Sequence, residues 1–157
     1  PVSSGSMGSC RSNRGFWKVV LGLGVGGIAL IVLVIAFRPV ARTGAVAFAQ
    51  SNLRTAEEAA ELIARVEGSL AEATPLRLRR EPAVGNLLFI DDDQSSNDSE
   101  VVSVRATGDA WTGAARADTG QCFWVRLEAS GETVRGTGTD CSAEQASAAE
   151  PGVWPEP

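Results

Sequence analysis

Ten consecutive residues that begin at Asp91 read DDDQSSNDSE and form the densest group of oxygen-bearing side chains in this sequence. Carboxylate, amide and hydroxyl oxygens are the ligands that calcium prefers. When Asp91 is taken as the first position of an EF-hand-type loop, Asp93 and Asn97 occupy useful positions. Ser96 stands where that loop needs glycine, and Val102 stands where it needs the closing glutamate. The segment is therefore a weak calcium candidate, and the simpler interpretation is a solvated acidic loop that holds no cofactor.

Cysteine thiols are the second group that could do chemistry. A bond between Cys122 and Cys141 would close a loop of about twenty residues, which stabilises a domain by about 3 kcal/mol in the chain-entropy model. Such a bond needs an oxidising compartment, and two reduced, buried cysteines are the alternative. Cys10 lies far away and would be a free thiol. Histidine is absent, which removes the commonest general base and metal ligand, so we expect no enzyme.

A long apolar run occupies residues 19–37, without a charged side chain or a proline. As a helix it would span about 28 Å at about 1.5 Å per residue, close to the roughly 30 Å hydrocarbon core of a bilayer. We therefore expect a transmembrane helix over residues 16–38, in contact with membrane lipid. Gly22 and Gly26 lie one turn apart in it and would allow close helix–helix packing.

The orientation of this expected span depends mainly on the cysteines. Cationic side chains are equally numerous on its two sides, so the positive-inside rule does not decide. An oxidising compartment for Cys122 and Cys141 places the C-terminal domain outside the cell and the N-terminus in the cytoplasm. The sequence of residues 47–49, AFA, is similar to a signal-peptidase site. The apolar run is longer than a secretory signal requires, so a retained anchor is favoured over cleavage.

Beyond the run, the pattern predicts an α+β domain. Apolar residues recur at three- and four-residue steps, which indicates one face of an amphipathic helix; they are Leu53, Ala56, Ala60, Ile63, Val66 and Leu70, and the opposite side carries Glu57, Glu58, Glu61 and Arg65. Thr55 and Glu58 form a capping box that would begin this helix, although it could equally run on unbroken from the apolar run. Gly68 would end it.

After a short apolar run at residues 86–90, four short segments of β type follow, separated by turn residues. They lie at residues 101–106, 110–117, 122–127 and 132–136. Tight turns between such segments predict a small antiparallel meander packed on the helix. In the segment at residues 122–127, Phe123, Val125 and Leu127 would share one face, with Cys122, Trp124 and Arg126 on the other. Trp111 and Trp124 are expected to pack against each other or against the disulfide.

These elements give an expected domain organisation. It comprises a disordered cytoplasmic tail (1–15), the transmembrane helix (16–38), a juxtamembrane segment (39–50), an extracytoplasmic α+β domain (51–146) and a flexible tail (147–157). The formal net charge of −5 leaves no basic stripe to neutralise phosphates, which argues against nucleic acid as a partner.

The order of elements resembles type IV pilins, and more closely the minor pilin- or pseudopilin-like proteins of high-GC Gram-positive bacteria. Residues 51–56 (SNLRTA) are similar to a stretch of the extended pilin helix. Residues 120–126 (GQCFWVR) and 136–141 (GTGTDC) are similar to the disulfide-bearing C-terminal strands. The resemblance implies a pilin-like α+β fold that acts by assembly with itself or with other pilin-like subunits.

The resemblance also implies processing, because Gly15 and Phe16 match the site where prepilin peptidase cuts. Val20 then occupies the fifth mature position, where pilins carry a glutamate that pairs during assembly. A minor, pilin-like subunit in pilus or secretion-type assembly, or in surface contact, therefore fits better than a major pilin. The alternative is a membrane-tethered extracytoplasmic binding or sensor module that does not polymerise.

Overall fold

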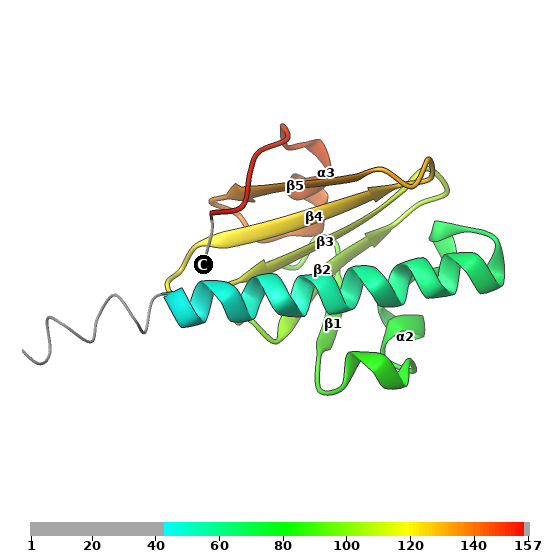
Figure 1. The fold of residues 1–157 in the computed structure, drawn as a ribbon, viewed down its shortest axis with the longest axis horizontal. Coiled ribbons are helices and arrows are strands. Elements are labelled where there is room, and N and C mark those ends of the chain that lie inside the picture. Colours follow the sequence, from blue (N-terminus) through cyan, green and yellow to red (C-terminus); the bar gives the residue numbers. More distant parts are fainter. Residues whose placement is uncertain (1–42, 156–157) are drawn as a thin grey trace, which may run out of the picture. The chain divides into compact units, whose positions relative to one another are not determined.

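The structure is a computed structural model that describes residues 43–155. It begins inside a helix that occupies residues 43–67, hereafter the long helix (Figure 1). Thr55 lies in its interior, where the hydroxyl donates to the Ser51 carbonyl oxygen at 3.2 Å, so the predicted capping box is wrong. Gly68 ends the helix as predicted, with a φ of 82° and its N–H donating to the Ala64 carbonyl oxygen at 2.8 Å. Glycine adopts this left-handed conformation without steric cost.

The remaining elements form a sheet with short helices around it. They are η1 (Leu70–Glu72), α2 (Pro75–Leu78), η2 (Pro82–Val84), β1 (Leu88–Asp91), β2 (Val101–Ala106), β3 (Ala110–Arg116), β4 (Cys122–Glu128), β5 (Thr133–Gly138) and α3 (Ala143–Ala148). The strands are ordered β1-β2-β3-β4-β5. Strands β2 to β5 pair antiparallel, which confirms the meander. Strand β1 pairs parallel with β2, so the sheet is mixed and the purely antiparallel prediction is wrong.

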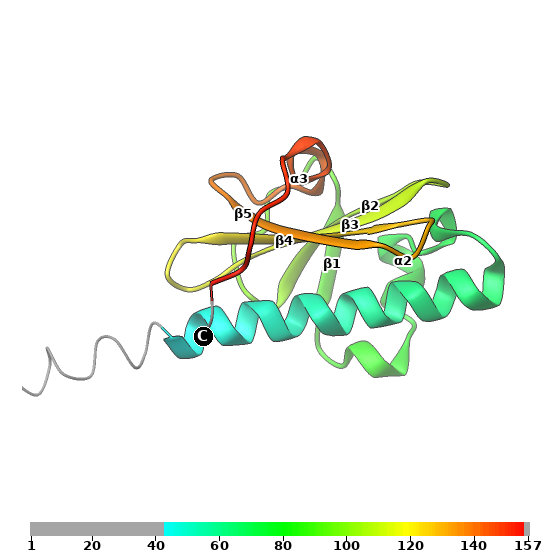
Figure 2. The same cartoon turned by 45° about the horizontal axis from the view of Figure 1, so that its top comes forward.

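The long helix covers one face of the sheet and builds the main core (Figures 1 and 2). Leu53, Ala56, Ala60 and Ile63 are fully buried, as their spacing predicts. The sheet supplies larger side chains to the same core, among them Phe89, Trp111, Phe123, Val125 and Leu127. Small residues on the helix opposite large ones on the sheet allow the two layers to interdigitate at interior packing density.

The opposite face of the sheet is partly covered by α3. A second buried cluster there contains Ala114, Cys122, Trp124, Cys141 and Ala146. The alternation predicted for β4 is therefore confirmed. Trp111 and Trp124 do not pack against each other, because they belong to clusters on opposite faces. Trp124 instead lies in the same cluster as the disulfide, the second of the two arrangements that we expected.

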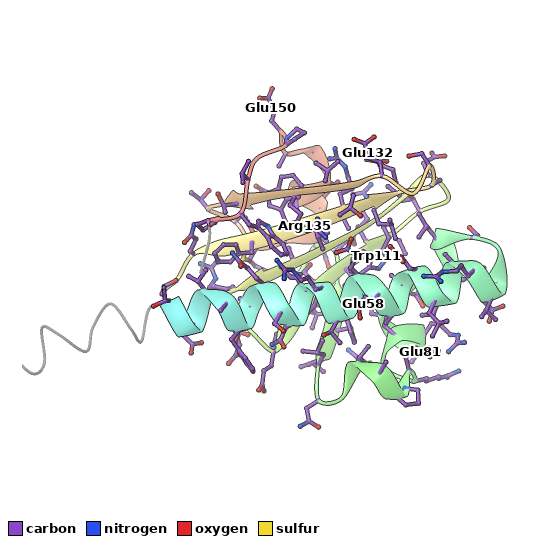
Figure 3. The ribbon with its side chains drawn as sticks, viewed as in Figure 1. Glu58, Glu81, Trp111, Glu132, Arg135 and Glu150 are labelled. Atoms are coloured by element: carbon purple, nitrogen blue, oxygen red, sulfur yellow. A yellow bond between two sulfur atoms is a disulfide. The ribbon has the colours of Figure 1, made fainter. Side chains whose placement is uncertain are left out.

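Two positions on the long helix differ from the helical pattern. Val66, expected in the core, is 70% exposed. Glu57, expected on the solvent side, is 5% exposed; its carboxylate accepts from the Arg135 guanidinium at 2.8 Å and from the Thr133 hydroxyl at 2.7 Å. Figure 3 shows Arg135 between the long helix and the sheet. Removal of Arg135 would leave the Glu57 carboxylate buried without a counter-charge, which is strongly destabilising.

The exposed side of the long helix keeps one predicted interaction. Arg65 and Glu61, four residues apart, form an ion pair with a distance of 2.9 Å between Nη2 and Oε2. This pairing contributes a few tenths of a kcal/mol, about 0.3, to an exposed helix.

The C-terminal segment packs on the domain, in contrast to the flexible tail predicted for residues 147–157. Trp154 is only 8% exposed, and its indole Nε1–H donates to the carbonyl oxygens of Trp124 and Gly136 at 3.1 and 3.0 Å. Its ring stands edge-on to Phe123, with 6.2 Å between ring centroids. The Gln50 amide donates to the Pro155 carbonyl oxygen at 3.0 Å. The segment therefore joins the edge of the sheet to the long helix.

We predict that Trp154→Ala lowers the free energy of unfolding by about 2 kcal/mol, through loss of buried aromatic area and two hydrogen bonds. Urea denaturation of the full chain measures this change. Val153→Ala is the matched control, because that neighbouring side chain is 90% exposed and should change stability by less than about 0.5 kcal/mol. Equal effects of the two substitutions would contradict a structural role for the indole.

The predicted fold class needs correction at its N-terminal end as well. Within residues 43–155 no helix has both the length and the apolar character needed to cross a bilayer. The transmembrane helix that we expected to lead into the domain is therefore not supported, and residues 16–38 lie outside the described part of the chain. The described architecture is a long helix and a five-stranded mixed sheet, an α+β arrangement.

Candidate functional site

The predicted disulfide is present and lies in the interior. Cys122 and Cys141 are bonded, with 5.3 Å between their Cα atoms, and both are fully buried. The bond connects the first residue of β4 to the segment that leads into α3. Its place in a packed cluster makes it a structural bond, because a redox-active cysteine needs solvent access.

The acidic segment is held in place by its serines. Ser96 is buried, and its hydroxyl accepts from the Arg116 N–H at 3.0 Å and donates to the Val101 carbonyl oxygen at 2.6 Å. Ser96 N–H donates to the Cys141 carbonyl oxygen at 3.0 Å, and the Ser95 hydroxyl accepts from Cys141 N–H at 3.2 Å. The disulfide-bearing segment therefore fixes the loop at its centre, where we had expected only solvation.

The calcium candidates Asp91, Asp93 and Asn97 all have exposed side chains. Among residues 43–155 no group of three or more acidic, cysteine or histidine side chains is arranged to hold a metal ion. The inward position of Ser96 gives a physical reason, since an EF-hand needs a sharp glycine turn at that point to bring its ligands together.

The other predicted site residues lie outside the described part of the chain. They are the processing pair Gly15 and Phe16 and the packing pair Gly22 and Gly26.

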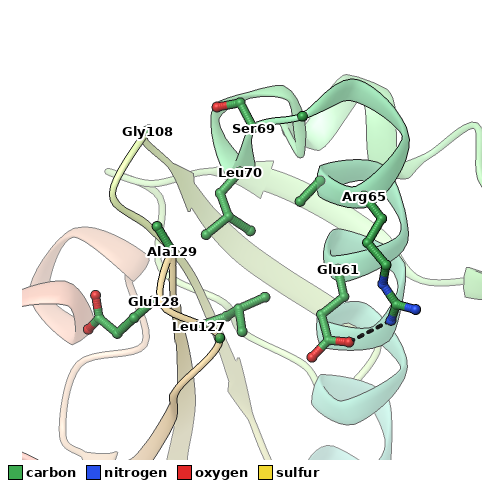
Figure 4. Close-up of a pocket in the computed structure, with 11 residues that line it drawn as sticks. Glu61, Arg65, Ser69, Leu70, Gly108, Leu127, Glu128 and Ala129 are labelled. Atoms are coloured by element: carbon green, nitrogen blue, oxygen red, sulfur yellow. Dashed lines mark hydrogen bonds and ion pairs between the residues drawn. The ribbon is translucent and has the colours of Figure 1, made fainter.

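A groove lies at the end of the domain where the long helix stops and two hairpins turn. We call it the hairpin groove; it has a volume of about 630 Å³ and is lined by residues that include Glu61, Ala64, Leu70, Gly108, Leu127 and Glu128. Leu70 and Leu127 reach into it from its two sides (Figure 4). Its volume falls within the range of ligand sites, roughly 300–1,000 Å³.

The polar groups of the hairpin groove favour contact over catalysis. Glu61 is engaged by Arg65, and Glu128 accepts from the Arg126 guanidinium at 2.7 Å. The Ser69 hydroxyl accepts from Ala71 N–H at 3.2 Å and acts as a helix cap. No pair of these side chains has the arrangement of a nucleophile and its base. The antiparallel meander predicted from the sequence brings the turns at Gly108 and Gly131 to one end of the sheet, but no local signal places the end of the long helix beside them.

The long helix also exposes apolar side chains along one flank. Phe48, Leu62 and Val66 are the large hydrophobic residues exposed on its described part. With about 3.6 residues per turn they lie within roughly 40° of one another and extend over about 27 Å. We call these three residues the apolar flank. The helical pattern does not predict the apolar flank, because it places Val66 on the core face of the helix.

Comparisons with known proteins found no matching family model, no similar curated protein and no similar solved structure.

Proposed function

We propose that residues 43–155 form a non-catalytic, pilin-like domain that acts outside the cytoplasm by contact with other subunits, either further copies of this chain or other pilin-like proteins. The observation that carries this proposal is the apolar flank of Phe48, Leu62 and Val66. Burial of exposed apolar area is the main favourable term in protein association, about 25 cal/mol per Å². Leu62 and Val66 lie one turn apart, and Phe48 lies about 21 Å away on the same side of the helix, beyond the buried Ala59. A neighbouring helix packed side by side would therefore contact the flank at two places.

Two further features support this proposal. The buried disulfide is typical of proteins that fold in an oxidising compartment. The long helix laid along an antiparallel meander agrees with the architecture that the resemblance implies.

A second candidate is a binding module that does not polymerise. The hairpin groove favours it, because its volume of about 630 Å³ would receive part of a partner without any contact between copies.

The test is self-association of the full chain, measured by sedimentation velocity over a range of concentrations. Leu62→Lys combined with Val66→Lys should weaken association at least about tenfold, because two charges would have to be desolvated in the contact. Lysine is a good helix former and is tolerated near a helix C-terminus, so the domain should stay folded.

The matched control makes the same change at two exposed apolar residues away from the long helix, Leu76→Lys with Val153→Lys. This control should associate like the unmodified chain. If both double variants associate equally, the apolar flank is not the contact surface. A chain that stays monomeric at all concentrations and with other pilin-like subunits would favour the second candidate.

A further inference from the structure

We propose that the hairpin groove docks an extended basic segment of a different protein, in which an apolar side chain lies between cationic ones. The groove and the apolar flank are different surfaces, so this proposal and the proposed function can fail separately. Three features of the molecule support it: the apolar floor of the groove, the charge at its mouth, and the charge of the chain as a whole.

The floor of the groove is apolar and already built. Leu70 and Leu127 are nearly buried, at 6% and 3% exposure, so their positions are fixed by packing rather than by a ligand. Ala64 and Ala129 add small side chains, and Gly108 adds none. One aliphatic side chain of a partner would therefore lose its water shell there without a rearrangement of the domain.

The excess negative charge at the mouth of the groove comes from residues next to its lining. Glu61 and Glu128 line the groove, but Glu61 is paired with Arg65 and Glu128 with Arg126. Asp109 and Glu132 follow directly after the lining residues Gly108 and Gly131, and neither forms an ion pair within residues 43–155.

The end of the long helix adds to this charge. Its last turn, next to Gly68, presents backbone carbonyl groups that carry the negative end of the helix dipole. Cationic side chains of a partner are therefore favoured at this mouth, and anionic ones are not.

The distribution of charge along the chain selects the occupant. Residues 1–42 contain five cationic side chains and no carboxylate, so the remainder of the chain carries a formal charge of −10 within the total of −5. The same part of a second copy also carries a formal charge of −10, so it does not supply the concentrated positive charge that this mouth favours. A basic segment of another protein is attracted over a distance of about one Debye length, roughly 8 Å at physiological salt.

The probe is a labelled twelve-residue peptide in which leucine alternates with arginine, titrated with the full chain and followed by fluorescence anisotropy. A peptide with glutamate in place of every arginine is the charge control. We expect the arginine peptide to bind at least about tenfold more tightly at low salt, and its affinity to fall as salt is raised. Asp109→Asn combined with Glu132→Gln should weaken binding about threefold.

Occlusion of the groove tests its location. The Cβ position of Gly108 faces open space, so Gly108→Trp should fill the groove without disturbing the core and weaken peptide binding about tenfold. Gly44→Trp is the matched control, because Gly44 is also unobstructed but lies on the long helix far from the groove in sequence. Thermal unfolding of both variants verifies that they fold.

Two results would overturn the proposal. One is equal binding of the arginine and glutamate peptides. The other is equal binding of the arginine peptide to folded Gly108→Trp and Gly44→Trp chains. Self-association is measured on the same samples and should be unchanged by Gly108→Trp, so the outcome here is independent of the apolar flank.

Discussion

Trp111→Ala should lower the free energy of unfolding by about 4 kcal/mol, since truncation of a buried tryptophan removes apolar burial and leaves a cavity. Trp111 is fully buried in the core between the long helix and the sheet (Figure 3). Its indole Nε1–H also donates to the Ala73 carbonyl oxygen at 3.2 Å. The side chain therefore connects β3 to the segment between η1 and α2, and its loss weakens two contacts at once.

A graded series separates these two contributions. Trp111→Phe keeps an aromatic ring in the core but leaves the Ala73 carbonyl without its donor, so it should cost about 1–2 kcal/mol. Leu76→Ala is the control, because that side chain is 61% exposed and should change stability by less than about 0.5 kcal/mol. Urea denaturation monitored by circular dichroism gives all three values. A loss below about 1 kcal/mol for Trp111→Ala would contradict its place in the core.

Removal of the disulfide is the second change with a large expected effect. Cys122→Ala combined with Cys141→Ala should destabilise the domain by about 3 kcal/mol and lower its Tm by roughly 10 °C, because the unfolded chain regains the entropy that the closed loop had removed. The bond also holds Cys141 beside Ser95 and Ser96, whose hydrogen bonds to its backbone fix the acidic segment. Its loss should therefore loosen that segment first.

The measurement is thermal unfolding with and without reductant. Reductant should lower the Tm of the unmodified chain and leave the double variant unchanged, because no other bond is available to break within residues 43–155. Cys10→Ser should behave like the unmodified chain. Thiol labelling verifies that the reductant has broken the bond completely. If the Tm of the unmodified chain is then the same with and without reductant, the bond contributes no stability.

Local pattern was sufficient for the elements whose signals lie within a few residues. The strand predicted at 101–106 agrees with β2, Val101–Ala106, and the two faces of β4 follow from strict alternation. Gly68 ends the long helix because the turn there needs a positive φ. The groove-lining turns at Gly108 and Gly131 were also recognisable as turns. These features depend on backbone preferences that each segment carries by itself.

The parallel pairing of β1 with β2 could not be read from the sequence. Neighbouring strands joined by a short link normally pair antiparallel. Here residues 92–100 run back to the starting end of β1, and about 30 Å of extended chain is sufficient for that return. The return path is held by Ser96, which contacts Arg116 and Cys141. The partners that decide the pairing lie twenty and more residues away in the sequence.

Periodicity and turn residues were therefore sufficient to predict the core face of the long helix and the antiparallel meander, and they favoured a bond between Cys122 and Cys141 over reduced thiols. The exposure of Val66, the burial of Glu57 beside Arg135 and the packing of Trp154 on the sheet became apparent only from the folded domain. The physical reason is that helical and strand periodicity specify which side chains share a face. Whether that face is covered depends on partners brought together from distant parts of the chain.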